Sequence, residues 1–372
     1  MRVSILYKHL PHYRVDFFNG LHATLTERHI DLDLLYGKSP SVPKRDEVDL
    51  DWARPVPNRI YGWGGWSLCW EQVPDDIYQS DLIVLMQENR VVSNHVLQVR
   101  AKARHRKIAF WDHGLNLQAP PLSVGNIIKK MYTGSAFWWF AYTESVKKWL
   151  VGTGFPPDHI TVVQNAIDTT FLRNQSAQVD DGTLSRLRAS LGIGLGPIGL
   201  FCGGMYKEKR LPFLLKACEG IRKAVPGFEM IFIGDGTHSH LVAEAARDLP
   251  WIHYIGPMFG ANVVPYMKLA DVFLMPGLVG LAVLDAFAME KPFITTDYPY
   301  HSPEIEYLVN GENGIMTRNS IKAFVAGVVE VLSSVDLQRR IRQGCQKAAM
   351  TYTVEQMVQN YAAGIEQALA AN

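Results

Sequence analysis

The sequence predicts an α/β protein made of two doubly wound, Rossmann-like domains that face each other across a cleft. Two observations predict this fold class. Strand and helix signals alternate along the chain at the spacing of βαβ units, and they do so in two successive series. The length of 372 residues also suits two domains, at roughly 150 residues each.

The first series consists of short apolar runs separated by helical patterns. Residues 15–29 have the spacing of an amphipathic helix, with Phe17, Phe18, Leu21 and Leu25 on one face. The run 81–86, Asp-Leu-Ile-Val-Leu-Met, has the continuous apolar character of a buried parallel strand. The other predicted strands are 3–7, 30–36, 107–111, 137–142 and 161–163.

The second series follows a polar stretch at 174–196. Its predicted strands are 198–202, 229–233, 252–255, 270–275 and 292–296, and its helices are 211–224, 238–248, 280–289 and 319–333. We therefore expect an N-terminal domain over 1–170, a C-terminal domain over 171–351 and a terminal segment at 352–372. In doubly wound sheets, ligands bind beyond the carboxyl ends of the strands, so the strand-to-helix loops are the candidate site.

Composition and charge exclude several classes of protein. Lys plus Arg is 37 and Asp plus Glu is 36, which gives a net charge of +1 and argues against a general nucleic-acid binder. With 48% apolar and 20% charged residues, the chain is globular and not disordered. The four cysteines form no CxxC pair, so we expect no zinc ribbon and a reducing compartment. The N-terminal apolar run ends at Lys8, too soon for a signal peptide, and we expect a cytoplasmic protein, peripheral to the membrane at most.

The clearest chemical signal lies at residues 276–292, PGLVGLAVLDAFAMEKP. A glycine-rich turn opens a helix there and is expected to leave the amides of Val279, Gly280 and Leu281 free to bind a phosphate or a sugar hydroxyl. Asp285, one to two turns into the helix, could accept two hydrogen bonds from a vicinal diol. The alternative is an ordinary turn between a strand and a helix, with Asp285 solvated or paired.

A second signal follows the first strand of the C-terminal series, at CGGMYKEKR, residues 202–210. Lys209 beside the loop of Gly203 and Gly204 can neutralise a diphosphate, although a run of this kind also occurs on solvated surfaces. In the first domain, His113 follows a predicted strand in a position where it could be either catalytic or structural. His12 and Arg14 lie in the first loop and could bind an acceptor or a phosphate, or form a capped turn.

Taken in order, these segments resemble the retaining GT-B glycosyltransferases of family four over about 300 residues. Asp285-Ala286-Phe287-Ala288 is similar to the second half of that family's Glu-x7-Glu-Ala-Met-Ala element, with Gly277 in place of the first Glu. The loop at 203–209 is similar to the Gly-Arg-x-x-x-Glu-Lys phosphate turn, with Gly204 in place of Arg. Ile255 and Gly256 resemble a loop that contacts the nucleotide base, and 352–369 resembles a helix that crosses back onto the first domain.

The resemblance implies transfer of a hexosyl unit from a nucleotide-diphosphate sugar to an acceptor hydroxyl, with retention, in the assembly of a surface polysaccharide or lipid-linked glycan. It implies that Lys209, Gly203, Gly204 and the turn at 277–281 bind the donor diphosphate, that Asp285 holds the ribose, and that His113 acts beside the donor sugar. His12 and Arg14 are assigned to the acceptor. Neither a metal nor a cofactor other than the donor is expected. A nucleotide-sugar epimerase on the same fold, or a non-catalytic subunit that has lost the Arg and Glu at 204 and 277, are the alternatives.

Three further patterns in the sequence are not expected to form a ligand site from their type alone. The Gly-x-Gly-x-x-Gly at 194–199 precedes its strand, so it is not expected to cradle a pyrophosphate. Asp31 and Asp33 are predicted to point to solvent from a strand, and Asp49 and Asp51 to lie in a loop, so neither Asp-x-Asp is expected to bind metal. The basic run 100–107 and the apolar segments 63–70 and 126–139 could dock on anionic lipid, although a solvated helix flank is slightly favoured.

Overall fold

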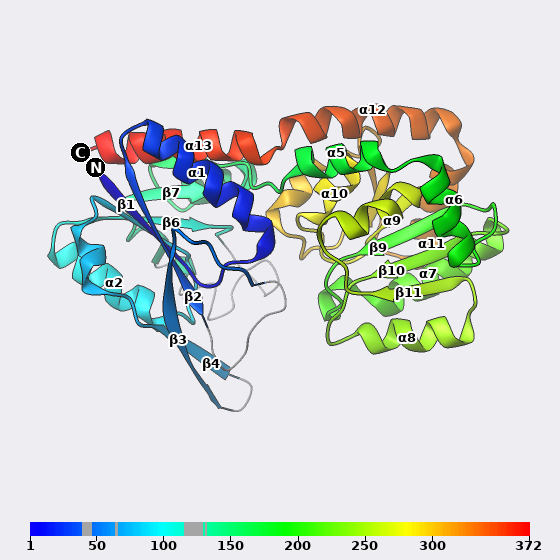
Figure 1. Ribbon diagram of the computed structural model, residues 1–372, viewed down its shortest axis with the longest axis horizontal. Helices are drawn as coiled ribbons and strands as arrows, with labels where there is room; N and C mark the ends of the chain where they lie inside the picture. The colour runs from blue at the N-terminus through cyan, green and yellow to red at the C-terminus, as the bar shows by residue number, and fades with distance from the viewer. Residues whose placement is uncertain (39–46, 64–65, 115–128, 131) are drawn as a thin grey trace. The chain divides into compact units, whose positions relative to one another are not determined.

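The computed structural model describes residues 1–38, 47–63, 66–114, 129–130 and 132–372. The chain divides into two compact units (Figure 1). Unit 1 comprises Met1–Ile167 and Val354–Asn372, and unit 2 comprises Asp168–Thr353. The expected limits at 170/171 and 351/352 lie close to these boundaries.

Unit 1 is built on an eight-stranded sheet with the order β4-β3-β2-β1-β5-β6-β7-β8, counted over the described residues. Neighbouring strands are parallel except β3 and β4, which form an antiparallel hairpin that the sequence analysis did not predict. The strands are β1 (Arg2–Tyr7), β2 (Asp31–Lys38), β3 (Arg54–Trp63), β4 (Trp66–Glu71), β5 (Leu82–Leu85), β6 (Lys107–Asp112), β7 (Trp138–Ala141) and β8 (Ile160–Val162). The main helices are α1 (Val15–Glu27), α2 (Val92–Ala103), α4 (Glu144–Gly152) and α13 (Val354–Ala370), and the short helix η1 (His12–Arg14) precedes α1.

Unit 2 has a parallel six-stranded sheet with the order β11-β10-β9-β12-β13-β14 in the part of the chain that the structure describes. The strands are β9 (Ile198–Cys202), β10 (Glu229–Ile233), β11 (Ile252–Gly256), β12 (Val272–Leu274), β13 (Phe293–Thr296) and β14 (Gly314–Thr317). The helices are α5 (Thr169–Gln178), α6 (Asp181–Ser190), α7 (Leu211–Ala224), α8 (Ser239–Asp248), α9 (Val264–Leu269), α10 (Ala282–Ala288), α11 (Ile321–Ser333) and α12 (Val335–Thr351). The winding reverses between β9 and β12, which makes their carboxyl ends the expected ligand crevice.

Both sheets confirm the predicted fold class, an α/β protein with two doubly wound, Rossmann-like domains. Their central strands are the apolar runs of the sequence, and β5 and β7 are buried along their whole length. Buried on both faces, such strands need helices on each side, which the alternating helical segments supply.

The terminal helix α13 belongs to unit 1 although it follows unit 2 in the chain. Tyr361 of α13 has no exposed surface, and its ring stacks on Phe140 at 4.2 Å between centroids. The rings of Phe17 and Trp111 complete the contact, at 5.4 Å and 5.0 Å. Lys107 donates to the carbonyls of Ala368 and Leu369 at the end of the helix, where a cation is favourable.

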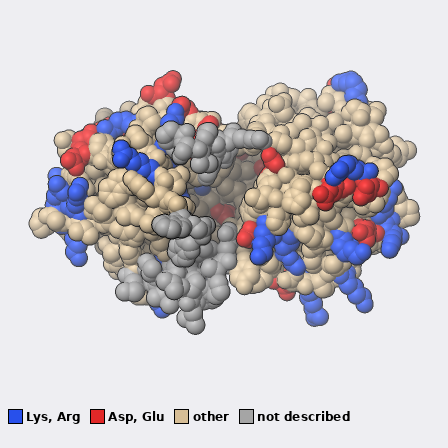
Figure 2. Space-filling model, turned by 90° about the horizontal axis from the view of Figure 1, so that it is seen from below, with Lys and Arg blue, Asp and Glu red and all other residues tan. Residues whose placement is uncertain are grey.

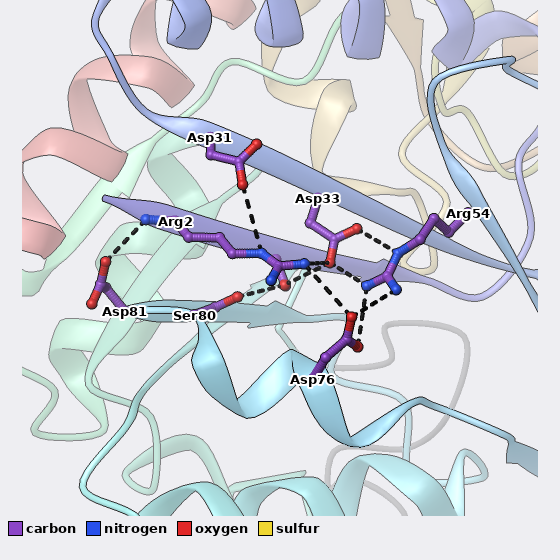
Figure 3. Close-up of polar contacts among 8 residues, drawn as sticks. Arg2, Asp31, Asp33, Arg54, Asp76, Ser80 and Asp81 are labelled. Carbon is purple, nitrogen blue, oxygen red and sulfur yellow. Dashed lines mark hydrogen bonds and ion pairs between the residues drawn. The ribbon is translucent and has the colours of Figure 1, made fainter.

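The prediction that Asp31 and Asp33 both point to solvent is confirmed for Asp31 and wrong for Asp33. Asp31 points to solvent, but the Asp33 carboxylate is buried among cations from both neighbouring strands (Figure 3). Its oxygens accept from Arg2 of β1 at 2.8 Å and from the Nε of Arg54 of β3 at 2.8 Å. Asp76 accepts from the same Arg54 at 2.9 Å. The side chain therefore serves an ion-pair network, whose partners come from distant parts of the sequence.

Other predictions are settled by the element boundaries. Gly194 and Gly196 precede β9, as expected. The predicted helix at 280–289 is shorter, because α10 begins only at Ala282. The apolar segment 126–139 falls partly on 126–128 and 131, which lie outside the described residues. Within the described ranges no helix is long and apolar enough to cross a bilayer. Figure 2 shows basic and acidic side chains in small groups over unit 2, with no continuous stripe of one sign on that face.

The packing of α13 predicts opposite outcomes for two substitutions of Tyr361. Its hydroxyl has no hydrogen-bond partner in the described structure. Tyr361→Phe should therefore leave the stability of the chain unchanged or raise it, whereas Tyr361→Ala should lower it by about 3–5 kcal/mol through loss of the buried ring. Urea denaturation measures both, and equal losses in the two variants would show that the hydroxyl matters more than the ring.

Candidate functional site

The candidate site lies at the carboxyl ends of β9 and β12 in unit 2. After β9 the chain passes Gly203 and Gly204 and forms the short helix η4 (Lys207–Lys209). After β12 it forms a turn over residues 276–281, here called the donor turn. The two segments touch, since the amide of Leu278 donates to the carbonyl of Glu208 at 2.9 Å.

Gly277 makes this contact sterically feasible. A Cβ atom at this position would lie 2.2 Å from the Glu208 carbonyl oxygen and 2.6 Å from the Lys209 carbonyl carbon. Both are backbone atoms that cannot rotate away. On this backbone the glutamate of the family-four pattern has no room, so its replacement follows from the close approach of η4 and the donor turn.

Lys209 is a buried cation, only 6% exposed. Its Nζ donates to the Leu278 carbonyl at 2.7 Å and lies 3.4 Å from the Met275 sulfur and 5.5 Å from the centre of the Tyr206 ring. The charge of the buried Glu304 carboxylate acts on Lys209 and favours the ammonium form. Burial lowers the pKa of Lys209 to about 8. An ammonium has three donors and the Leu278 carbonyl takes one of them, so Lys209 is suited to bind an anion.

Asp285 is the acidic group of the same site. Its side chain is half-buried on α10 and makes no hydrogen bond or ion pair with the residues that the structure describes. Burial raises the pKa of the carboxyl to about 7. An unpaired carboxyl of this kind can accept hydrogen bonds from two hydroxyls of a ligand, and its raised pKa is typical of a functional site.

The donor turn differs from the prediction at one amide. The Val279 N–H is not free, because it donates to Nδ1 of His301 at 3.0 Å. The amides of Gly280 and Leu281 have no hydrogen bond to any described residue. His301 was missed by the sequence analysis, because a histidine between β13 and the next short helix belongs to no motif.

The remaining predicted donor residues lie along the same edge of the sheet. Gly203 follows β9, and its amide donates to the Ile233 carbonyl at 3.0 Å. Gly204 is exposed, and a Cβ there would lie 3.0 Å from the Tyr206 ring. Ile255 and Gly256 end β11, and the carbonyl of Gly256 accepts from the amide of Gly234 at 2.9 Å. The structure thus gathers these residues at one edge, and their roles stay predictions.

In unit 1, His113 directly follows β6 and keeps 41% of its side-chain surface exposed. Its Nδ1 lies 2.5 Å from the buried carboxylate of Asp112, whose other oxygen pairs with Lys129 at 3.1 Å. Burial alone would raise the pKa of Asp112, but the charges of His113 and Lys129 bring it well below its ordinary value. Asp112 therefore orients the His113 ring and leaves its other edge accessible.

The prediction for Arg14 is corrected. The side chain is 2% exposed and its donors are used inside unit 1. It donates to Asn165 Oδ1 at 2.6 Å, to the Ala166 carbonyl at 3.4 Å and to the Tyr7 hydroxyl at 3.3 Å. Arg14 therefore links η1 to residues 165–166, near the end of the Met1–Ile167 segment of unit 1. Its neighbour His12 is exposed, beside the Tyr13 ring.

Known proteins are similar to this chain in overall fold, and a family model matches part of unit 2. Residues 196–334 match the family model of glycosyl transferases group 1. The HepE protein of Anabaena, solved in complex with UDP, is similar over 98% of this chain and 99% of its own, with a TM-score of 0.71 and 14% identity. WaaG, a glycosyltransferase involved in lipopolysaccharide biosynthesis, is similar over 97% and 98%, with a TM-score of 0.66 and 14% identity.

Sucrose-phosphate synthase from Thermosynechococcus elongatus is similar over the full length of both chains, with a TM-score of 0.72 and 12% identity. No curated protein sequence matches the chain. The chain therefore has the GT-B fold of glycosyltransferases. Within unit 2, residues 196–334 are similar to the glycosyl transferases group 1 family, in agreement with the predicted enzyme class.

The contact between η4 and the donor turn predicts different tolerance at two nearby glycines. Gly277→Ala should lower the stability by more than about 2 kcal/mol, because its Cβ overlaps fixed backbone atoms. Gly280→Ala should change it by less than about 0.5 kcal/mol, because a Cβ there meets only Ser302, at 3.6 Å. Thermal unfolding compares the two. A Gly277→Ala variant as stable as wild type would contradict the close packing described here.

Proposed function

We propose that the chain transfers a hexosyl unit from a nucleotide-diphosphate sugar to an acceptor hydroxyl, with retention of anomeric configuration. The observation that carries the proposal is the buried ammonium of Lys209. It is 6% exposed, donates to the Leu278 carbonyl at 2.7 Å and lies at the point where the winding of the unit 2 sheet reverses. The bound UDP in the similar HepE structure supports a uridine nucleotide as the first donor to test.

The proposed chemistry needs no nucleophile from the protein. The bond between the sugar carbon and the diphosphate oxygen breaks and its electron pair stays on that oxygen. The acceptor oxygen forms the new bond to the sugar carbon, and the proton of the acceptor hydroxyl passes to the departing phosphate oxygen. Lys209 and the free amides of Gly280 and Leu281 would stabilise the departing diphosphate, in surroundings where charge is poorly screened. Because Gly203 and Gly204 have no side chains, the protein backbone there could approach the diphosphate closely. Asp285 would hold the ribose hydroxyls.

The other roles follow the same division. Ile255 and Gly256 are proposed to contact the base. His113, oriented by Asp112, is proposed to act beside the donor sugar, and His12 is proposed to bind the acceptor. A lipid-linked glycan or a growing surface polysaccharide is the proposed acceptor, supported by the involvement of the similar WaaG in lipopolysaccharide biosynthesis.

A peripheral membrane contact is part of the proposal, and it rests on the β3–β4 hairpin. Tyr61 and Leu68 are opposite each other on its two strands and both are exposed, as is Trp70. Tyr and Trp side chains favour the membrane–water interface. The basic run 100–107 contributes less than expected, because Arg104 stacks on Tyr78 and Lys107 bonds the end of α13.

The hairpin can be tested with phosphatidylcholine vesicles containing phosphatidylglycerol. Replacing Tyr61 and Leu68 together by Ser should weaken co-sedimentation at least about tenfold, because two apolar side chains leave the lipid interface. Val99→Ser, at another exposed apolar position, is the matched control. If the double variant sediments like wild type, the hairpin does not bind the membrane.

The proposed role of Lys209 predicts unequal effects on turnover for substitutions of two neighbouring lysines. Lys209→Met should lower release of UDP from UDP-sugars by about 100-fold or more, since a charge that stabilises the leaving group is lost. Lys207→Met, at an exposed neighbour, should have little effect. In wild type, turnover should fall as the pH rises through about 8, where Lys209 loses its proton, and the variant should lack this fall. Wild-type turnover in Lys209→Met would refute the proposed role.

A further inference from the structure

His301 is held rigidly in the unit 2 core, between β13 and the short helix η6 (Pro303–Tyr307). The side chain is 6% exposed. Its Nδ1 faces the Val279 N–H at 3.0 Å, and its Nε2 faces the Thr296 carbonyl at 2.8 Å. A nitrogen that faces an N–H must accept, and one that faces a carbonyl must donate. The contacts therefore select the neutral imidazole with its proton on Nε2.

His301 and Lys209 contact the same peptide unit, between Leu278 and Val279, one through its N–H and the other through its carbonyl. Leu278, the residue before Val279, accepts from Lys209 Nζ at 2.7 Å and donates to Glu208 at 2.9 Å. On the other side, the amide of Ser302 donates to the Val279 carbonyl at 2.9 Å. The donor turn is thus bound to η4 at Leu278 and to the 301–302 segment at Val279.

We infer that His301 is a positioning residue, which places the Lys209 ammonium by fixing the donor turn and which releases the turn when its ring becomes cationic. The inference rests on the proposed function and deepens it. A second proton would sit on Nδ1, where it would point at the Val279 N–H and remove the only acceptor that this amide has among the described residues.

The surroundings of the ring decide when this happens. Burial lowers the pKa of His301 below its ordinary 6.5, the Thr296 carbonyl acts in the opposite direction, and the nearby cations Lys209 and Arg210 lower the pKa further. Asp297 favours the cation, and the Tyr298 ring lies 5.8 Å away. The ring therefore stays neutral at pH 7 and becomes charged only under acidic conditions.

Two amide substitutions separate the two ring nitrogens. His301→Asn puts an amide oxygen near the position of Nδ1, so it can still accept from Val279. His301→Gln extends further and its amide takes the place of Nε2, so the Val279 N–H loses its acceptor. Neither variant can gain a charge. Both are of similar polarity, which makes them matched tests of one hydrogen bond.

The experiment measures UDP affinity by calorimetry between pH 5 and pH 8 for wild type and both variants, with thermal unfolding as the check on folding. At pH 7.5, His301→Gln should bind UDP about tenfold more weakly, and its turnover of UDP-sugars should fall about 10- to 100-fold through misplacement of Lys209. His301→Asn should stay within about fivefold of wild type. Towards pH 5, wild type should lose UDP affinity more steeply than His301→Asn. The titration of UDP and of Asp285 is common to both proteins, so the difference between the two pH profiles reports on His301.

Equal UDP affinity and turnover in His301→Gln and wild type would overturn the inference, as would an acid limb that is unchanged in His301→Asn. If His301→Gln fails to fold, the comparison of wild type with His301→Asn across pH still decides. A wild-type chain that binds none of UDP, GDP and dTDP would refute the proposed function itself. That outcome differs from the others because it appears without any substitution.

Discussion

The candidate site of unit 2 is organised around one buried hydrogen bond, from the Lys209 ammonium to the Leu278 carbonyl. An ammonium taken out of water loses its hydration, and one carbonyl and a sulfur atom replace only part of it. The depressed pKa of Lys209 expresses this imbalance. A diphosphate would restore what burial has removed, so the same arrangement that costs stability in the free protein favours binding of the anion.

The surrounding backbone is arranged so that this bond can form. Gly277 allows η4 and the donor turn to approach within van der Waals distance, and His301 and Ser302 hold the turn from its other side. The absence of a glutamate at position 277, where the family-four pattern has one, therefore reflects the local packing. It does not by itself indicate loss of function, because Lys209 in η4 and Asp285 in α10 still follow the carboxyl ends of β9 and β12.

The features of the chain that depend on local sequence could be predicted, and those that depend on distant partners could not. Apolar runs that end at glycine-rich turns located the central strands, Lys209 and the donor turn. Nothing near Arg14 shows that Asn165 will accept from it, and nothing near Asp33 shows that Arg2 and Arg54 will surround it. The β3–β4 hairpin was missed because Pro55 and Pro57 lie in its first strand, where proline is uncommon.

A crystal structure of the chain with UDP would show whether the diphosphate binds at Lys209. We expect a diphosphate oxygen within hydrogen-bonding distance of Lys209 Nζ and the ribose hydroxyls at the Asp285 carboxylate, with η4 and the donor turn in contact as they are here. A nucleotide bound at another edge of the sheet, or a diphosphate that is contacted only by exposed side chains and leaves Lys209 unpaired, would contradict this expectation.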